Sequence, residues 1–144
     1  VREPGRPLRL EEPDYIPGTA FWIHRDVFEA LGGFDESYHT YWEDVDFSMR
    51  AHRAGFTLLR CEDSVALHGV GQTCHKNALY TTFYFQRNRI RFCRRFLEPG
   101  DCRRAEELIR VELDELKRRW AAAGDGRRLD YLRIIRAELE GGRV

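Results

Sequence analysis

The chain has 144 residues, of which 42% are apolar and 33% are charged, and its formal net charge at pH 7 is zero. This length and composition predict one domain, or part of a larger one, and exclude a long disordered chain or a membrane-embedded one. No run approaches the roughly 18 apolar residues of a transmembrane helix, and the first residues lack the apolar stretch of a signal peptide.

The net charge of zero is a cancellation between two halves. Residues 1–75 carry 7 basic and 13 acidic side chains, whereas residues 76–144 carry 17 basic and 11 acidic ones. We therefore expect an extended loop leading into the domain over residues 1–14, which contain three prolines. We expect a mixed α/β region over residues 15–75 and a helical region over residues 76–144.

Apolar periodicity predicts alternating short strands and helices in the first half. The expected strands are 19–23, 56–61 and 64–67, and the expected helices are 26–31 and 43–54. Gly32-Gly33 and Gly55 should end the two helices, because glycine adopts the left-handed backbone of a helix C-terminus. His68 follows the last expected strand.

The second half has a helical pattern throughout. The expected helices are 77–97, 101–123 and 129–139, with breaks at Pro99-Gly100 and at Gly124-Asp125-Gly126. On the middle helix, Glu107 and Arg110, and Asp114 and Lys117, have the spacing of ion pairs on a solvated face.

The four cysteines, Cys61, Cys74, Cys93 and Cys102, show no CxxC spacing. We expect reduced thiols in a cytoplasmic protein. A zinc site built from Cys61, His68, Cys74 and His75 stays open as an alternative, although its spacing fits none of the familiar structural zinc patterns.

Three carboxylates, Glu43, Asp44 and Asp46, stand at the start of the expected helix 43–54. The plain interpretation is favourable interaction with the helix dipole and with water. The preceding Tyr41 and Trp42 favour a second interpretation, in which aromatic side chains form a binding wall beside a reacting carboxylate.

Two segments give the sequence a family resemblance: GTAFWIHRDVFEALGGFDE at 18–36 and YWEDVDFSMRAHRAGF at 41–56. With His68 and Arg87-Asn88-Arg89 in the same order, they resemble the second half of a family 2 glycosyltransferase of the GT-A fold, rhamnosyltransferase-like, over residues 15–96. The resemblance implies the α/β fold class: the C-terminal, acceptor-side half of that fold, followed by a helical C-terminal extension.

The same resemblance implies roles for individual residues. Asp44 corresponds to the catalytic base, and His68 corresponds to a ligand of the metal that holds the donor diphosphate. The residues matching substrate-binding positions are Gly18 and Ala20 near the donor sugar, Trp42 and Glu43 on the acceptor side, and Asp46 as a second acid.

The implied reaction is inverting transfer of a sugar from a nucleoside-diphosphate sugar to a saccharide or lipid-linked acceptor in bacterial polysaccharide assembly. It implies a divalent metal, Mg or Mn, bound mainly with the nucleotide-sugar and an N-terminal half, without which this fragment should be inactive. The alternative is a non-catalytic module, derived from such an enzyme, that binds a glycan or a membrane surface.

Residues 76–96 hold six basic and no acidic side chains among several aromatic ones. They fit an amphipathic helix packed on the domain, or peripheral contact with an anionic membrane at its inner face through Arg87, Arg89, Arg91, Arg94 and Arg95. No recognised nucleic-acid motif is present, so we expect no nucleic-acid partner, and nucleic-acid binding by these arginines stays open only as a third, weaker option. The apolar residues of helix 101–123 leave packing on a second copy open.

Overall fold

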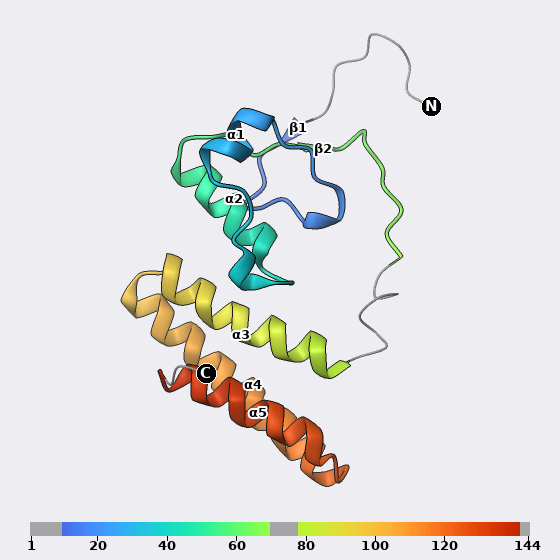
Figure 1. Cartoon of the computed structure of the whole chain (residues 1–144), viewed down its shortest axis with the longest axis vertical. Coiled ribbons are helices and arrows are strands. Elements are labelled where there is room, and N and C mark those ends of the chain that lie inside the picture. Colours follow the sequence, from blue (N-terminus) through green and yellow to red (C-terminus); the bar gives the residue numbers. More distant parts are fainter. Residues whose placement is uncertain (1–9, 70–77, 142–144) are drawn as a thin grey trace. The chain divides into compact units, whose positions relative to one another are not determined.

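The structure, a computed structural model, describes residues 10–69 and 78–141 (Figure 1). The chain divides into two compact units. The N-terminal unit is the described part of Val1–His39 together with that of Glu43–Val70. The helical unit is Thr40–Trp42 together with the described part of Gly71–Val144.

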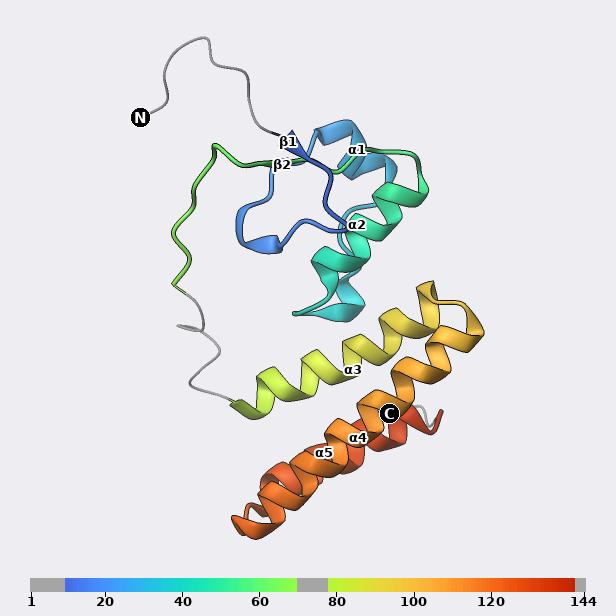
Figure 2. The same cartoon turned by 180° about the vertical axis from the view of Figure 1, so that it is seen from behind.

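The N-terminal unit has two short strands, two α-helices and two single 3-10 turns. In chain order these are β1 (Leu10–Glu11), η1 (Gly18–Ala20), α1 (Arg25–Ala30), η2 (Glu36–Tyr38), α2 (Glu43–Arg53) and β2 (Arg60–Cys61). The strands pair antiparallel, with Leu10 opposite Cys61. Figure 2 shows the two strands side by side from behind. The arginine at 60 bridges this pair, since it binds both Glu11 and Glu62.

Helix α1 is defined by its two ends. At its start the Nδ1 of His24 accepts a hydrogen bond from the backbone N–H of Asp26 at 3.3 Å, so this histidine is a helix cap. At its end Gly32 and Gly33 have φ of +72° and +75°. The N–H of Gly33 donates to the carbonyl of Phe28 at 2.9 Å, so the glycine stop predicted from the sequence is confirmed.

Four phenylalanines pack against one another in the N-terminal unit. Phe47 on α2 is buried, and its ring lies 5.0 Å from that of Phe34, 5.9 Å from that of Phe28 and 6.2 Å from that of Phe21. Rings at these separations, tilted or edge-on, add about 0.5–1.5 kcal/mol per pair beyond their area burial. The cluster thereby connects α1, α2 and the segment after η1.

Two of the predicted strands are wrong. Residues 18–20 form a 3-10 turn instead of starting a strand, and residues 64–67 have no strand pairing. In the predicted strand 56–61 only Arg60–Cys61 pairs. An apolar run becomes a strand only when a second strand satisfies its backbone, and among the described residues only β1 and β2 do this for each other. Leu67 is accordingly fully exposed.

The helical unit consists of α3 (Ala78–Phe96), α4 (Pro99–Ala122) and α5 (Gly126–Leu139), so the three predicted helices are confirmed. Two boundaries differ from prediction. Pro99 opens α4 instead of standing outside it, because a first-turn proline lacks only an N–H that has no helical partner. The carboxylate of Asp125 accepts from the N–H of Arg128 at 3.1 Å, which starts α5 early.

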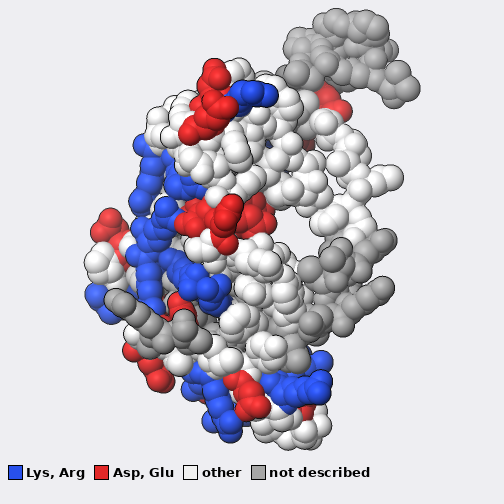
Figure 3. All heavy atoms as spheres, in the orientation of Figure 1, with Lys and Arg blue, Asp and Glu red and all other residues white. Residues whose placement is uncertain are grey.

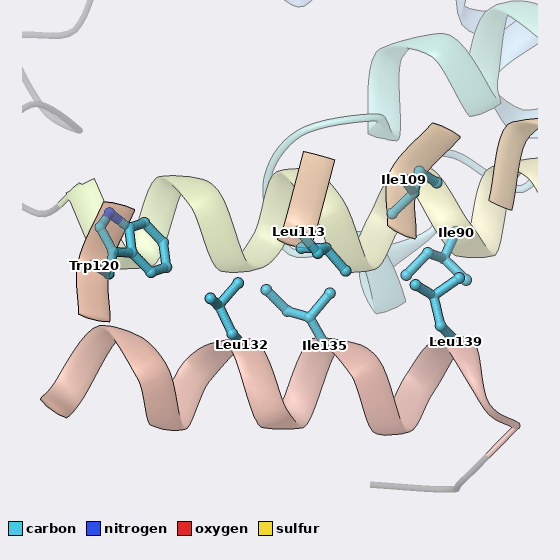
Figure 4. Packing of buried hydrophobic residues seen from close by; sticks show 7 residues of the cluster. All are labelled: Ile90, Ile109, Leu113, Trp120, Leu132, Ile135 and Leu139. Carbon is cyan, nitrogen blue, oxygen red and sulfur yellow. The ribbon is translucent and has the colours of Figure 1, made fainter. Parts of the chain in front are cut away.

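The core of the helical unit is a single apolar cluster. Figure 4 shows its seven buried members: Ile90, Ile109, Leu113, Trp120, Leu132, Ile135 and Leu139. The residues of α5 point toward those of α3 and α4. Burying each aliphatic side chain is worth about 1.5–3 kcal/mol, so this cluster is the main source of the unit's stability.

Arginines on α3 bind acids and carbonyls of the other two helices. Arg89 lies 2.7 Å from Glu112, and Arg91 lies 3.3 Å from Glu138. Arg94 lies 2.7 Å from Glu106 and donates to the carbonyls of Glu138 at 2.8 Å and Leu139 at 2.7 Å. Basic and acidic side chains therefore lie beside one another on this unit, as the space-filling view in Figure 3 also shows.

On α4 the predicted pair between Glu107 and Arg110 is present at 3.4 Å, whereas Asp114 binds Arg136 of α5. None of the helices in the part of the chain that the structure describes combines the length and the apolar character needed to cross a membrane.

Candidate functional site

A pocket of about 610 Å³ opens in the N-terminal unit, between η1, η2 and the start of α2. Its lining combines four carboxyl groups with two aromatic rings. The lining residues are Gly18, Phe21, Phe34, Asp35, Glu36, His39, Glu43 and Asp44. We call it the acidic pocket.

Asp44, the residue predicted as the base, is held in one orientation on the wall of the acidic pocket. Its Oδ2 accepts a hydrogen bond from the N–H of Gly18, and its Oδ1 accepts one from the N–H of Val45, both at 2.8 Å. A Cβ added at Gly18 would meet the Cβ and Oδ2 of Asp44 at 3.4 Å. A methyl group would therefore fit in ordinary contact with the carboxylate, whereas a larger side chain at position 18 would meet it.

Glu43, next to Asp44, has different surroundings. Its Oε2 is buried and has no hydrogen-bond partner among the described residues. Burial raises the pKa of the Glu43 carboxyl above its usual range, and the nearby Asp44 charge adds to the shift. A buried carboxyl oxygen without a partner disfavours the charged form of Glu43.

Phe34 and Phe21 give the acidic pocket an apolar side. Their ring centroids lie 5.8 Å apart in an edge-on arrangement, and Phe34 also packs on Phe28 and Phe47. The inner members of the cluster hold Phe34 in place while 36% of its surface stays exposed. A pocket with a fixed aromatic face and a few convergent polar groups is the usual form of a site for a small ligand.

His68 reaches the same turn as Asp44. Its Nδ1 lies 3.3 Å from the hydroxyl of Thr19, and Thr19 follows the Gly18 whose N–H binds Asp44. His68 does not line the acidic pocket. The two predicted functional side chains therefore contact consecutive residues of η1.

The described residues do not bring together a complete metal site. Nowhere in residues 10–69 and 78–141 do three or more His, Cys, Asp or Glu side chains form a group that could hold a metal ion. Among these residues His68 would supply only one of the ligands that a metal ion needs. Two residues of the alternative zinc site, Cys74 and His75, lie outside the described residues. The described cysteines, Cys61, Cys93 and Cys102, are free thiols.

Three predicted substrate-binding residues are not among those that line the acidic pocket. Asp46 is fully buried, and its carboxylate binds the Nε of Arg50 at 2.7 Å. Arg50 also donates to the carbonyls of Leu31 at 2.7 Å and Gly33 at 2.8 Å. In this structure Asp46 holds the arginine that fastens the end of α1, and its role in substrate binding stays a prediction.

The other two are Ala20 and Trp42. Ala20 is exposed on η1 and does not line the pocket. Trp42 belongs to the helical unit, where its ring lies 5.2 Å from that of Phe92 and 5.7 Å from that of Phe85. Its aromatic side chain serves packing there.

Five lining residues were not predicted as site residues: Phe21, Phe34, Asp35, Glu36 and His39. The signal for two of the acids and one ring was present in the segment Gly33-Phe34-Asp35-Glu36, where polar and aromatic residues follow a helix stop. The pocket forms because η2 folds this segment back: Asp35 caps η2 by accepting from the N–H of Ser37 at 3.0 Å.

Comparison with known proteins relates the chain to glycosyltransferases over part of its length. It is 32% identical over 89 residues to the low-salt glycan biosynthesis hexosyltransferase Agl10 of Haloferax volcanii, covering 60% of this chain and 29% of that protein. It is 35% identical over 67 residues to the N-acetylglucosaminyl-diphospho-decaprenol L-rhamnosyltransferase of Mycobacterium tuberculosis, covering 44% of this chain and 22% of that protein.

The chain thus spans less than a third of the length of these two curated relatives. No model of a protein family matches it, and no solved structure matches it. The relationship to glycosyltransferases therefore rests on sequence alone, and the expected GT-A fold stays a prediction.

Proposed function

We propose that this chain is the acceptor-side part of a family 2 glycosyltransferase of the GT-A fold, in which Asp44 is the general base. The observation that carries the proposal is the fixed Asp44 carboxylate on the wall of an open pocket with an aromatic side. The partial relationship to a hexosyltransferase and a rhamnosyltransferase supports the same class of reaction.

In the proposed reaction, a hydroxyl oxygen of a saccharide or lipid-linked acceptor attacks the anomeric carbon of a nucleoside-diphosphate sugar. The bond between that carbon and the diphosphate oxygen breaks as the new glycosidic bond forms, and the configuration inverts. The carboxylate of Asp44 takes the hydroxyl proton. The diphosphate carries away the electron pair of the broken bond.

The charge of the acidic pocket supports its assignment to the acceptor. Four carboxyl groups line it, and like charges in one site repel a diphosphate. A neutral saccharide fits better, since its hydroxyl groups can donate to the carboxylate of Asp44. Its C–H surface can lie against Phe34.

A divalent metal beside the donor diphosphate, with His68 as one ligand, belongs to the same proposal. Peripheral membrane contact stays a separate prediction, and three of the five arginines predicted to make it bind acids of α4 and α5. A non-catalytic glycan-binding module is the alternative outcome of the test.

The test measures sugar transfer by the full-length protein that carries this chain. A panel of uridine- and thymidine-diphosphate sugars is offered with free and polyprenyl-diphosphate-linked saccharides as acceptors. We expect Asp44→Asn to lower kcat by about 10²–10⁴, the usual contribution of a general base. Asp26→Asn on the exposed side of α1 is the matched control and should transfer normally.

Wild-type rates in Asp44→Asn would reassign the base. A wild-type protein that binds saccharide but transfers no sugar would favour the binding module.

A further inference from the structure

Two segments of the N-terminal unit have extended backbone without strand partners. Phe21 has φ of −92° and ψ of +137°, and His24 has φ of −64° and ψ of +135°, both within the range of a β-strand. Residues 64–69 form no helix or strand, and in Figure 1 the green trace that follows β2 is extended. Among the described residues, no backbone hydrogen bond involves 22–23 or 65–67. We call residues 22–23 and 65–67 the open edge.

The open edge carries the three most exposed large apolar side chains of the described residues. Trp22 is 84% exposed, Val65 is 85% exposed and Leu67 is 100% exposed. Val65 and Leu67 stand two positions apart, so in an extended chain their side chains lie on the same face. Apolar side chains in water beside unpaired backbone groups mark a surface that another element covers.

A side-chain contact brings the two segments of the open edge close to each other. The Nδ1 of His68, which follows the second segment, lies 3.3 Å from the hydroxyl of Thr19, which precedes the first. The second segment leaves β2 through a single turn, in which the N–H of Ser64 donates to the carbonyl of Cys61 at 3.1 Å. The open edge is therefore one surface of the N-terminal unit, next to the end of β2.

A segment of the longer protein fits this surface better than a second copy of the chain. This chain covers 29% and 22% of the two curated relatives, so most of their length has no counterpart in it. A segment of the same polypeptide has a high effective concentration at the edge, whereas a second copy must reach it by diffusion. An extended segment would satisfy the free N–H and C=O groups and cover the apolar side chains with its own.

We infer that the open edge is an interaction surface, at which an extended apolar segment from the remainder of the full-length polypeptide pairs as an added strand. The inference rests on the proposed function only in taking this chain as part of a longer protein, and it needs no catalytic residue. Strand addition would also explain why residues 19–23 and 64–67 have the apolar pattern of strands although neither forms one here.

The first experiment maps the occupant of the edge without measuring activity. p-Benzoylphenylalanine is placed at position 67 of the full-length protein, and the products of photo-cross-linking are digested and identified by mass spectrometry. We expect a cross-link within one polypeptide, from position 67 to a peptide outside these 144 residues. A cross-link between two polypeptides would assign the edge to a second copy and overturn the inference. A cross-link to a peptide of this chain, or none, would overturn it as well.

The second experiment measures the thermal stability of the full-length protein. Leu67→Lys should lower the melting temperature by roughly 5 °C or more, because the added strand would bury an unpaired charge. Leu108→Lys is the matched control, since Leu108 is 55% exposed on α4, and it should melt like wild type. An unchanged melting temperature in Leu67→Lys would show that position 67 stays in water and would overturn the surface.

The failure of this surface and the failure of the proposed function give different results. A full-length protein that transfers no sugar but forms the expected cross-link would remove the proposed function and support the surface. A protein that transfers sugar without this cross-link would overturn the surface alone.

Discussion

Glu43 and Asp44 are neighbours in sequence with different surroundings. Two backbone N–H groups bind the carboxylate of Asp44, whereas the Oε2 of Glu43 is buried without a partner among the described residues. The first arrangement orients a base, and the second disfavours the charged form of the Glu43 carboxyl. Glu43 and Asp44 are therefore expected to have different roles in the acidic pocket.

The raised pKa of Glu43 predicts a pH-dependent stability. A carboxyl group whose pKa is higher in the folded state binds more protons there, so its contribution is fully present below the unfolded pKa and is lost as pH rises through the folded one. We expect Glu43→Gln to gain thermal stability relative to wild type as pH rises from about 4.5 toward neutrality. Melting curves from pH 4 to 8 check this, with Glu29→Gln as control; parallel curves for wild type and Glu43→Gln would contradict it.

The space at Gly18 predicts a graded effect on the base. A methyl group at position 18 would lie in ordinary contact with Asp44, at 3.4 Å, whereas a branched side chain would displace the carboxylate. We expect Gly18→Ala to retain most of kcat and Gly18→Val to lose about tenfold or more. Steady-state transfer kinetics measure both; equal rates in the two variants would show that position 18 does not set the position of Asp44.

Part of the candidate site was predictable from residue types and order. Asp44, Glu43 and Gly18 stand in the motifs that carry the family resemblance, and all three line the acidic pocket. Phe21 and His39 were missed because only the fold brings them to Asp44. The burial of Asp46 could have been anticipated, since Arg50 follows it at the four-residue spacing of a helical ion pair.

At the scale of elements, the helices were predictable and the strands were not. Helix periodicity and caps are local, so the Gly32-Gly33 stop and the acids that start α2 mark their elements within a few residues. A strand needs a partner that the local sequence does not reveal, and the apolar residues Val65 and Leu67 lie 85% and 100% exposed instead of in a sheet.

The turn after α1 provides a matched pair of substitutions. Gly32 and Gly33 both have positive φ, but only at Gly33 would a Cβ meet the Phe28 ring, at 3.1 Å. We expect Gly32→Ala to cost about 1–2 kcal/mol from backbone strain alone. Gly33→Ala should cost more, because the Phe28 ring, which packs on Phe34 and Phe47, must also move.

Urea unfolding of the two glycine variants, followed by near-ultraviolet circular dichroism of the phenylalanine cluster, measures the difference. An equal loss of unfolding free energy in the two variants would mean that the Phe28 ring moves aside at no cost.

At the scale of the molecule, the helical unit has its own apolar core and its own set of ion pairs. The cluster is contiguous through α3, α4 and α5, and the α3 arginines surround it with charged hydrogen bonds. Sequence periodicity predicted the three helices, whereas the partners of the arginines depended on how the helices pack. An excess of basic residues on one helix was balanced by acids far along the chain.

Two leucines of α4 test this core. Leu113 is fully buried, whereas Leu108 on the same helix is 55% exposed. We expect Leu113→Ala to lower the free energy of unfolding by about 2–5 kcal/mol. Leu108→Ala should change it by no more than about 0.5 kcal/mol. Far-ultraviolet circular dichroism during denaturation reports both, and similar losses would place the core elsewhere.

Arg94 binds the last turn of α5, and this contact limits how far the C-terminus can be shortened. Because the guanidinium binds the carbonyls of Glu138 and Leu139, the backbone through Leu139 is part of the folded bundle. An affinity tag or a fluorescent fusion can follow Gly141 without disturbing these bonds. Truncation ahead of Glu138 would strip away both acceptors together with the buried Leu139, and should yield an insoluble product.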